Sequence, residues 1–223
     1  MEKKGYDAFA GDVFSPIYPA YAHKIIERTG VRTGKLLDLG SGGGFLGFAL
    51  MDLGEFEEVT FLDKQGKQLD NARRRAEALA FPEDACRYVE QDACDLSCFE
   101  DNTFSLVVSR GSMQFWDDRI AAIREIHRVL KPMGYCYIGG GVGVTDRQTD
   151  RMDVLMERMA SEYGVGHGKK PQEASDDRKK SRTQQCKDYA DLFHEMNCSY
   201  ALINSKAEGG WFIFRKDDEL TIW

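Results

Sequence analysis

Short apolar runs alternate with helical patterns between residues 35 and 140, and this alternation limits the fold more than any other feature. The apolar runs end at turn residues and predict five buried strands, at 35–39, 58–63, 85–90, 103–109 and 135–138. Apolar residues at helical spacing predict helices between them, over 45–53, 65–80 and 117–130. Strands that alternate with helices of this length are typical of βαβ units, so the sequence predicts a parallel sheet covered by helices on both faces.

The pattern changes after residue 145. Residues 146–163 favour a polar helix, and a charged, glycine-containing stretch follows. Long connections in compact domains are usually functional or disordered, so we expect residues 146–185 to form a lid insertion. Helical spacing then predicts a further helix over 186–196.

Two β-prone runs, 199–205 and 209–215, flank Lys206-Ala-Glu-Gly209 and predict a closing hairpin. We therefore expect an α/β fold: a three-layer Rossmann-like sandwich whose seven-stranded sheet is mostly parallel and carries a C-terminal antiparallel hairpin strand. The 223 residues show no internal repeat, so one domain over 1–223 is expected, with N-terminal cap helices over 1–34.

Composition narrows the classes of function. The net charge of −7 and the hydrophobic fraction of 42% indicate a globular domain and argue against a general nucleic-acid binder, which usually carries a basic face. The basic run at Arg73, Arg74 and Arg75 is interpreted as a solvated helix face. The first residues lack the apolar stretch of a signal peptide, and no window approaches about 18 apolar residues, so we expect no membrane span and a cytoplasmic location.

The segment Asp38-Leu-Gly-Ser-Gly-Gly-Gly44 directly follows the first predicted strand and opens a helix. Its glycines lack Cβ atoms, so the backbone can turn tightly and a ligand can lie against it. The helix adds unpaired N–H groups and the positive end of its dipole. In a parallel sheet this turn lies at the carboxyl edge where the strand order reverses, so a ligand site is expected there.

The spacing of this segment narrows the choice of ligand. Counted from Gly40, the last glycine of a Gly-x-Gly-x-x-Gly dinucleotide motif would fall on Phe45, and no Gly-Lys-Ser/Thr of a P-loop follows. An acid before the first glycine suits a cationic ligand, and a sulfonium amino acid carries an ammonium group. Taken alone, the motif also fits a simple strand-to-helix turn.

Two further acids strengthen the interpretation as a ligand site. Asp63 ends the second predicted strand, where its carboxylate can grip the diol of a ribose, as it also would in a nicotinamide enzyme. Asp92 follows the third predicted strand, where a carboxylate can accept a hydrogen bond from an adenine amino group. The pair therefore favours a nucleoside ligand.

At this point the chain resembles the class I S-adenosylmethionine-dependent methyltransferases, especially the small-molecule members of the ubiquinone and menaquinone biosynthesis type. The resemblance covers about residues 16–145 and rests on the order and spacing of five segments: Leu36–Gly44, Phe61-Leu-Asp63, Gln91-Asp-Ala93, Asn102–Ser109 and Arg124–Pro132. Met133 stands where the family usually has the first glycine of Pro-Gly-Gly.

The resemblance implies S-adenosylmethionine as cofactor and S-adenosylhomocysteine as product. The methionine part would contact the glycine turn and the fourth strand, and the implied residues are Asp38, Gly40, Ser41, Gly42 and Ser109. The ribose and the adenine would contact the ends of the next two strands, and the implied residues are Asp63, Lys64, Asp92 and Ala93. The cofactor would supply the methyl group for an in-line displacement, so the protein chiefly aligns the acceptor and excludes water.

Two segments are candidates for the pocket of a small-molecule acceptor. Tyr18 and Tyr21 precede the first strand, in a region that folds over the cofactor in similar enzymes; they either present ring faces to the sulfonium or pack a helix on the sheet. Arg110, Gln114 and Trp116 leave the fourth strand, where related enzymes place substrate contacts. Because the Arg110 fork suits a carboxylate or phosphate, we expect an anionic acceptor, with a structural ion pair as the alternative.

The cysteines and histidines of the chain do not indicate a further site. Cys86, Cys94 and Cys98 are interpreted as buried thiols rather than metal ligands, because no C-x2-C pair is present and the four histidines are scattered, so no metal is expected. Two alternative functions stay open. One is an NAD(P)-dependent oxidoreductase, disfavoured by the glycine spacing and by the lack of a Tyr-x-x-x-Lys pair. The other is an interaction subunit that resembles a methyltransferase and binds the cofactor but transfers no methyl group.

Overall fold

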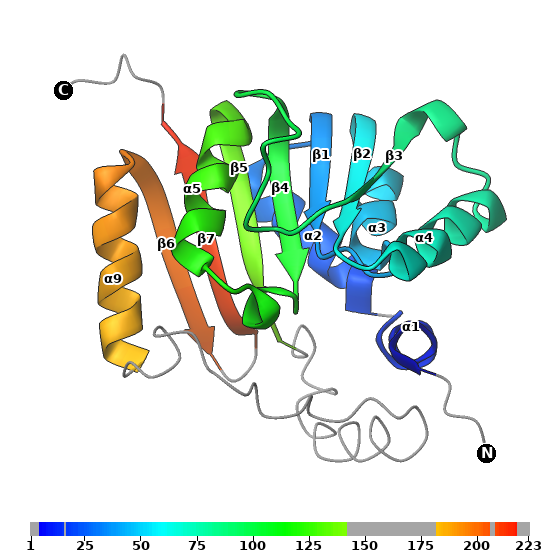
Figure 1. The fold of residues 1–223 in the computed structure, drawn as a ribbon, viewed down its shortest axis with the longest axis horizontal. Helices are drawn as coiled ribbons and strands as arrows, with labels where there is room; N and C mark the ends of the chain where they lie inside the picture. Colours follow the sequence, from blue (N-terminus) through cyan, green and yellow to red (C-terminus); the bar gives the residue numbers. More distant parts are fainter. Residues whose placement is uncertain (1–4, 16, 142–181, 206–207, 218–223) are drawn as a thin grey trace.

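The computed structural model describes residues 5–15, 17–141, 182–205 and 208–217 (Figure 1). Its strands are β1 (Thr33–Leu39), β2 (Glu55–Asp63), β3 (Cys86–Glu90), β4 (Phe104–Arg110), β5 (Leu130–Gly140), β6 (Cys198–Ser205) and β7 (Gly209–Lys216). Its longer helices are α2 (Ile17–Thr29), α3 (Phe45–Leu53), α4 (Gly66–Ala78), α5 (Arg119–Val129) and α9 (Arg182–Glu195). Shorter helical segments are α1 (Gly5–Phe9), η1 (Ala10–Phe14), η2 (Glu83–Ala85) and η3 (Met113–Phe115).

The seven strands form one sheet in the order β3-β2-β1-β4-β5-β7-β6. Strands β1 to β5 pair in parallel, and β7 pairs antiparallel with both β5 and β6. The order reverses between β1 and β4, so the two strands leave a crevice at their carboxyl ends. This topology confirms the predicted fold class, including the single antiparallel strand of the C-terminal hairpin.

Alternate residues of the central strands face two separate hydrophobic clusters. In β1, Leu36 packs with α2, α3 and α4 on one face, whereas Leu37 and Leu39 pack with α5 and α9 on the other. Figure 1 shows α5 in front of the sheet and α2 and α3 behind it. This is the three-layer arrangement expected for strands buried on both faces.

Most element boundaries differ from the predictions by one to four residues, and β5 differs most. The helix before it ends at Val129, as Pro132 and Gly134 predict, but β5 already begins at Leu130, which pairs with Phe104. A register irregularity between Phe104 and Leu106 accommodates the turn at residues 132–134. An isolated apolar residue before a proline gives no strand signal, so the sequence placed the start of this strand at 135.

Some predictions lie outside the described residues. They include the polar helix over 146–163 and nearly all of the lid insertion over 146–185; only its last residues fall in α9, which begins four residues earlier than expected. The single-domain organisation stays a prediction. In the described residues, no helix combines the length and the apolar content that crossing a bilayer requires.

Met133 adopts a left-handed backbone conformation, with φ of +64°, in the turn of β5, and its side chain is exposed. A residue with a Cβ atom loses about 1–2 kcal/mol in this region, whereas glycine does not. A glycine at this position would therefore carry less backbone strain than methionine.

We expect Met133→Gly to stabilise the protein by about 0.5 kcal/mol, because relief of the left-handed strain exceeds the extra entropy of glycine in the unfolded chain. Urea unfolding measures the change. Met133→Ala is the matched control, since it removes the exposed side chain but keeps the Cβ atom. A Met133→Gly protein no more stable than Met133→Ala contradicts the explanation.

Candidate functional site

The glycine-rich turn connects β1 to α3 at the point where the strand order reverses. Gly40 and Gly42 have φ of +61° and +54°, a conformation that glycine adopts without strain. A Cβ atom on Gly40 would collide with the side chain of Ser112, so only glycine allows the loop after β4 to approach this closely. A Cβ atom on Gly42 would meet nothing within 4 Å, so this glycine faces open space.

Asp38 lies at the end of β1 and is 2% exposed. Its Oδ2 accepts a hydrogen bond of 3.0 Å from the N–H of Gly47 in the first turn of α3. Burial raises the pKa of this carboxyl to about 7, and the negative charge of Asp63 adds to the rise, although the Gly47 hydrogen bond opposes it. A cation bound next to Asp38 would favour its ionised form.

Asp63 ends β2 and holds the glycine turn from the other side. Its Oδ2 accepts from the Gly42 N–H at 3.0 Å, and its Oδ1 accepts from the Gln65 N–H at 2.9 Å. The next residue, Lys64, is exposed. After β3, Asp92 Oδ1 accepts from the Cys94 N–H at 2.8 Å in the same way. Each of these carboxylates is oriented by the backbone N–H of its own loop.

Ser112 connects the glycine turn to the loop after β4. Its hydroxyl donates to the carbonyl of Leu39 at 3.1 Å and accepts from Trp116 Nε1 at 3.1 Å. Because the only proton of Ser112 is used on Leu39, the 2.6 Å contact between the Ser109 and Ser112 hydroxyls has Ser109 as donor. Ser109 is fully buried, and its own oxygen is left with acceptor capacity only.

Arg110 and two tyrosines form an aromatic, cationic wall beside the turn. The Arg110 guanidinium donates to Tyr18 Oη at 3.3 Å and to the carbonyl of Gly141 at 3.0 Å. It also lies 4.4 Å from the ring centroid of Phe14 and 5.5 Å from that of Tyr21, within cation–π range. Tyr21 donates to the same Gly141 carbonyl at 2.8 Å, and burial raises the pKa of its hydroxyl.

Gln114 and Trp116, the other two residues predicted to contact the methyl acceptor, lie in different surroundings. Gln114 is exposed, and its amide donates to the carbonyl of Gly111 at 3.3 Å. Trp116 is 4% exposed and packs in the hydrophobic cluster between the sheet and α5. Its indole N–H donates to the Ser112 hydroxyl, so Trp116 holds the loop after β4 against this hydrophobic cluster. Its contact with an acceptor stays a prediction.

The structure also brings in residues that the sequence analysis did not select. A small cavity of about 30 Å³ at the glycine turn is lined by Asp38 and Arg110 and also by Tyr18 and Phe45. Arg75, from the basic run on α4, donates to the carbonyl of Gly43. The basic run was a signal for this contact, but helical spacing alone does not tell which arginine faces the turn.

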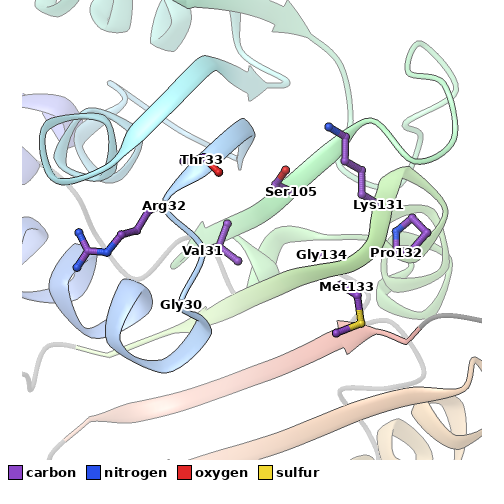
Figure 2. Close-up of a pocket in the computed structure, with 9 residues that line it drawn as sticks. All are labelled: Gly30, Val31, Arg32, Thr33, Ser105, Lys131, Pro132, Met133 and Gly134. Atoms are coloured by element: carbon purple, nitrogen blue, oxygen red, sulfur yellow. The ribbon is translucent and has the colours of Figure 1, made fainter. Parts of the chain in front are cut away.

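A pocket of about 230 Å³ lies at the opposite edge of the sheet, between the segment before β1 and the Met133 turn (Figure 2). Figure 2 shows the Arg32 and Lys131 side chains pointing in different directions, so the pocket has no convergent set of charged groups. Ligands of open α/β sheets bind at the carboxyl ends of the strands, so the small cavity at the glycine turn is the better candidate despite its size.

Comparison with known proteins identifies the family of this chain. A family model described as a methyltransferase domain matches residues 37–138, which contain the glycine turn, Asp63, Asp92 and Arg110. A solved structure of a putative S-adenosyl-L-methionine-dependent methyltransferase from Methanococcus maripaludis is 31% identical, with a TM-score of 0.75 over 97% of this chain and 92% of that chain. The chain belongs to the class I S-adenosylmethionine-dependent methyltransferases, as its sequence motifs predict.

Curated relatives match a shorter stretch. The 2-methyl-6-phytyl-1,4-hydroquinone methyltransferase 1 of Oryza sativa subsp. japonica is 39% identical over 47% of this chain and 30% of its own length. A demethylmenaquinone methyltransferase of Staphylococcus aureus is 29% identical over 59% of this chain and 53% of its own. The malonyl-[acyl-carrier protein] O-methyltransferase of Halorhodospira halophila is 30% identical over 59% and 45%. The matches thus span about a third to a half of each curated relative.

The residues at the turn fit the cofactor that the family implies. The open space at Gly42 allows a ligand to lie against the backbone. Among the described residues, the buried hydroxyl of Ser41 has no hydrogen-bond partner, and a buried polar atom normally has one. An additional polar group at the turn would satisfy it.

We expect the affinity for S-adenosylmethionine to rise by up to about tenfold between pH 6 and pH 8, because Asp38 attracts the ammonium group only when ionised and its pKa is raised to about 7. Calorimetric titrations across this range measure the change. Asp38→Asn should bind more weakly with a flat profile, and the exposed Asp52→Asn on α3 serves as the control. Equal affinities of the wild-type protein at pH 6 and pH 8 would contradict this role.

Proposed function

We propose that the protein transfers a methyl group from S-adenosylmethionine to a small-molecule acceptor by in-line displacement. One observation carries the proposal: a buried acid, a glycine-rich turn, an arginine and a tyrosine line the same small cavity. Membership of the methyltransferase family supports it. The cofactor would supply an electrophilic methyl group, and the chain's residues bind the cofactor, align the acceptor and exclude water.

The cofactor is held along the carboxyl ends of three neighbouring strands. In this proposal Asp38 binds the ammonium of the methionine part, and Gly40, Ser41, Gly42 and Ser109 line that part. Asp63, followed by Lys64, binds the ribose diol, and Asp92 with Ala93 binds the adenine. The backbone contacts of Asp38, Asp63 and Asp92 support these roles, since each carboxylate is oriented before a ligand arrives.

The acceptor binds on the side of the loop after β4. Arg110 is a fixed cation with a planar fork, so an anionic acceptor is the proposed class. The rings of Tyr18 and Tyr21 exclude water from the reacting atoms and stabilise positive charge by about 0.5–2 kcal/mol. Gln114 and Trp116 complete this side. Alignment and loss of water lower the barrier by about 7–11 kcal/mol in favourable cases, so a dedicated base is not required.

The names of the curated relatives suggest where to look for the acceptor. Two of the three relatives are named for hydroquinone or menaquinone precursors and one for a malonyl thioester. Hydroquinones and malonyl groups both ionise to oxygen anions, which suits Arg110. Acceptors with an ionisable hydroxyl or carboxyl group are therefore the first to test. The cytoplasmic location stays a prediction.

Two measurements test the proposed function. S-adenosylhomocysteine should raise the melting temperature by mass action and NAD should not, which separates a methyltransferase from an NAD(P)-dependent oxidoreductase. Incubation with methyl-labelled cofactor and a metabolite extract should then give labelled product. Binding without any transfer would instead identify an interaction subunit, and no binding to correctly folded protein would overturn the proposal.

Once an acceptor is known, Arg110→Ala should raise its KM by about tenfold or more, because an arginine–anion pair is lost at a water-poor site. The KM for S-adenosylmethionine should change much less. Steady-state kinetics with each substrate varied measures both. Arg124→Ala is the control, since Arg124 pairs with Glu195 on the exposed face of α5. An unchanged acceptor KM in Arg110→Ala excludes the anion-binding role.

A further inference from the structure

The basic run on α4 is not a uniform solvated face. Arg73 and Arg74 bind along their own helix, to Asp70 and Asn71, and remain exposed. Arg75 instead turns away from solvent, with a side chain that is 21% exposed, and its guanidinium donates to the carbonyl of Gly43. Arg75 thus ties α4 to the turn that holds the cofactor in the proposed function.

Arg75 is also the first member of a stack that crosses the small cavity. Its guanidinium carbon lies 3.5 Å from the ring centroid of Phe45. Phe45 in turn stacks on Tyr18, with centroids 5.1 Å apart and planes 11° from parallel. Tyr18 accepts the hydrogen bond from Arg110. The stack therefore runs from α4 to the end of β4 and closes one side of the site.

Asp7 joins the N-terminal segment to this stack. Its Oδ2 lies 3.4 Å from the Arg75 guanidinium, and a Cβ atom on Gly43 would collide with its Oδ1. Figure 1 shows α1 beyond the carboxyl ends of β1 and β2, where this contact holds it. Among the residues described, no donor reaches the buried Asp7 Oδ1. A buried oxygen without a donor is costly, so the contact is weaker than a fully paired one.

The cavity at the glycine turn is small compared with known ligand sites. A cavity of about 30 Å³ has room for a few water molecules at most, whereas sites for ligands of drug size measure about 300–1,000 Å³. Tyr18 and Phe45 line the cavity and belong to the stack. The cavity therefore has no room for the methionine part of the cofactor unless the lining side chains shift.

We propose that Arg75 is a positioning residue that holds the glycine turn, and that its pair with Asp7 is a latch that limits the rate at which cofactor enters and leaves. This inference rests on the proposed function. Opening the latch frees α1, separates the stack and exposes the turn. Closing it over bound cofactor restores the Gly43 contact and keeps water away from the site.

The test uses S-adenosylhomocysteine, with binding followed by stopped-flow tryptophan fluorescence. Asp7→Asn should raise the association rate constant about threefold or more, and the dissociation rate constant with it, because the mutation removes the charge of a partly buried ion pair. A merely structural contact would lower affinity or stability but would not speed association. Asp70→Asn breaks the exposed pair with Arg73 on the same helix and should leave both rate constants unchanged.

Arg75→Gln should also speed association, but it should weaken affinity by about tenfold, because the charge-assisted hydrogen bond to Gly43 is lost as well. Arg75→Lys should recover part of that affinity. The effect of Asp7→Asn on association should vanish in the Arg75→Gln background, since the two residues act as one latch. Salt should speed association to the wild-type protein more than to Asp7→Asn.

The outcomes separate the latch from the proposed function. If S-adenosylhomocysteine binds and Asp7→Asn associates at the wild-type rate, the latch is overturned and the proposed function stands. If Asp7→Asn and Arg75→Gln act additively, the two residues act independently and the latch is likewise overturned. If the wild-type protein does not bind S-adenosylhomocysteine at all, the proposed function itself fails.

Discussion

The contact between the buried Asp38 carboxylate and the Gly47 N–H holds the end of β1 to the first turn of α3, and the site depends on it. It fixes where the glycine turn leaves the sheet, and Asp63 binds the same turn from β2 through Gly42. The negative charge of Asp63 also contributes to the raised pKa of Asp38. The fold thus stores an electrostatic cost that a cationic ligand relieves.

Strand register then decides which groups face each other. Asp38 lies opposite Val108 in β4, so Arg110, two residues further on, extends beyond the end of β1 and lies beside the turn. Asp38 and Arg110 both line the cavity, so it carries an acidic and a basic group. In the proposed function, this combination suits a cationic cofactor and an anionic acceptor held next to each other.

The sequence predicts the fold well because the fold depends on local signals, and the same signals single out the glycines and acids that the structure brings to one edge of the sheet. Apolar periodicity marks the strands, and glycines and acids mark the strand ends. It could not predict Arg75, because helical spacing puts Leu69, Ala72 and Ala76 on the buried face of α4 and leaves Arg73 and Arg75 at its two borders. Only the packing of α4 against the turn decides which border faces the site.

The two sides of the site therefore follow different constraints. The cofactor side is built from strand ends and backbone N–H groups, which the sheet holds in place whatever the acceptor. In the proposed function, the acceptor side comes from α2, the loop after β4 and Gly141. Its side chains are held by one another and by one backbone carbonyl: Arg110 donates to Tyr18, and both Arg110 and Tyr21 donate to the Gly141 carbonyl. Such contacts can change with one substitution while the sheet stays intact, so a common fold and cofactor are compatible with different acceptors.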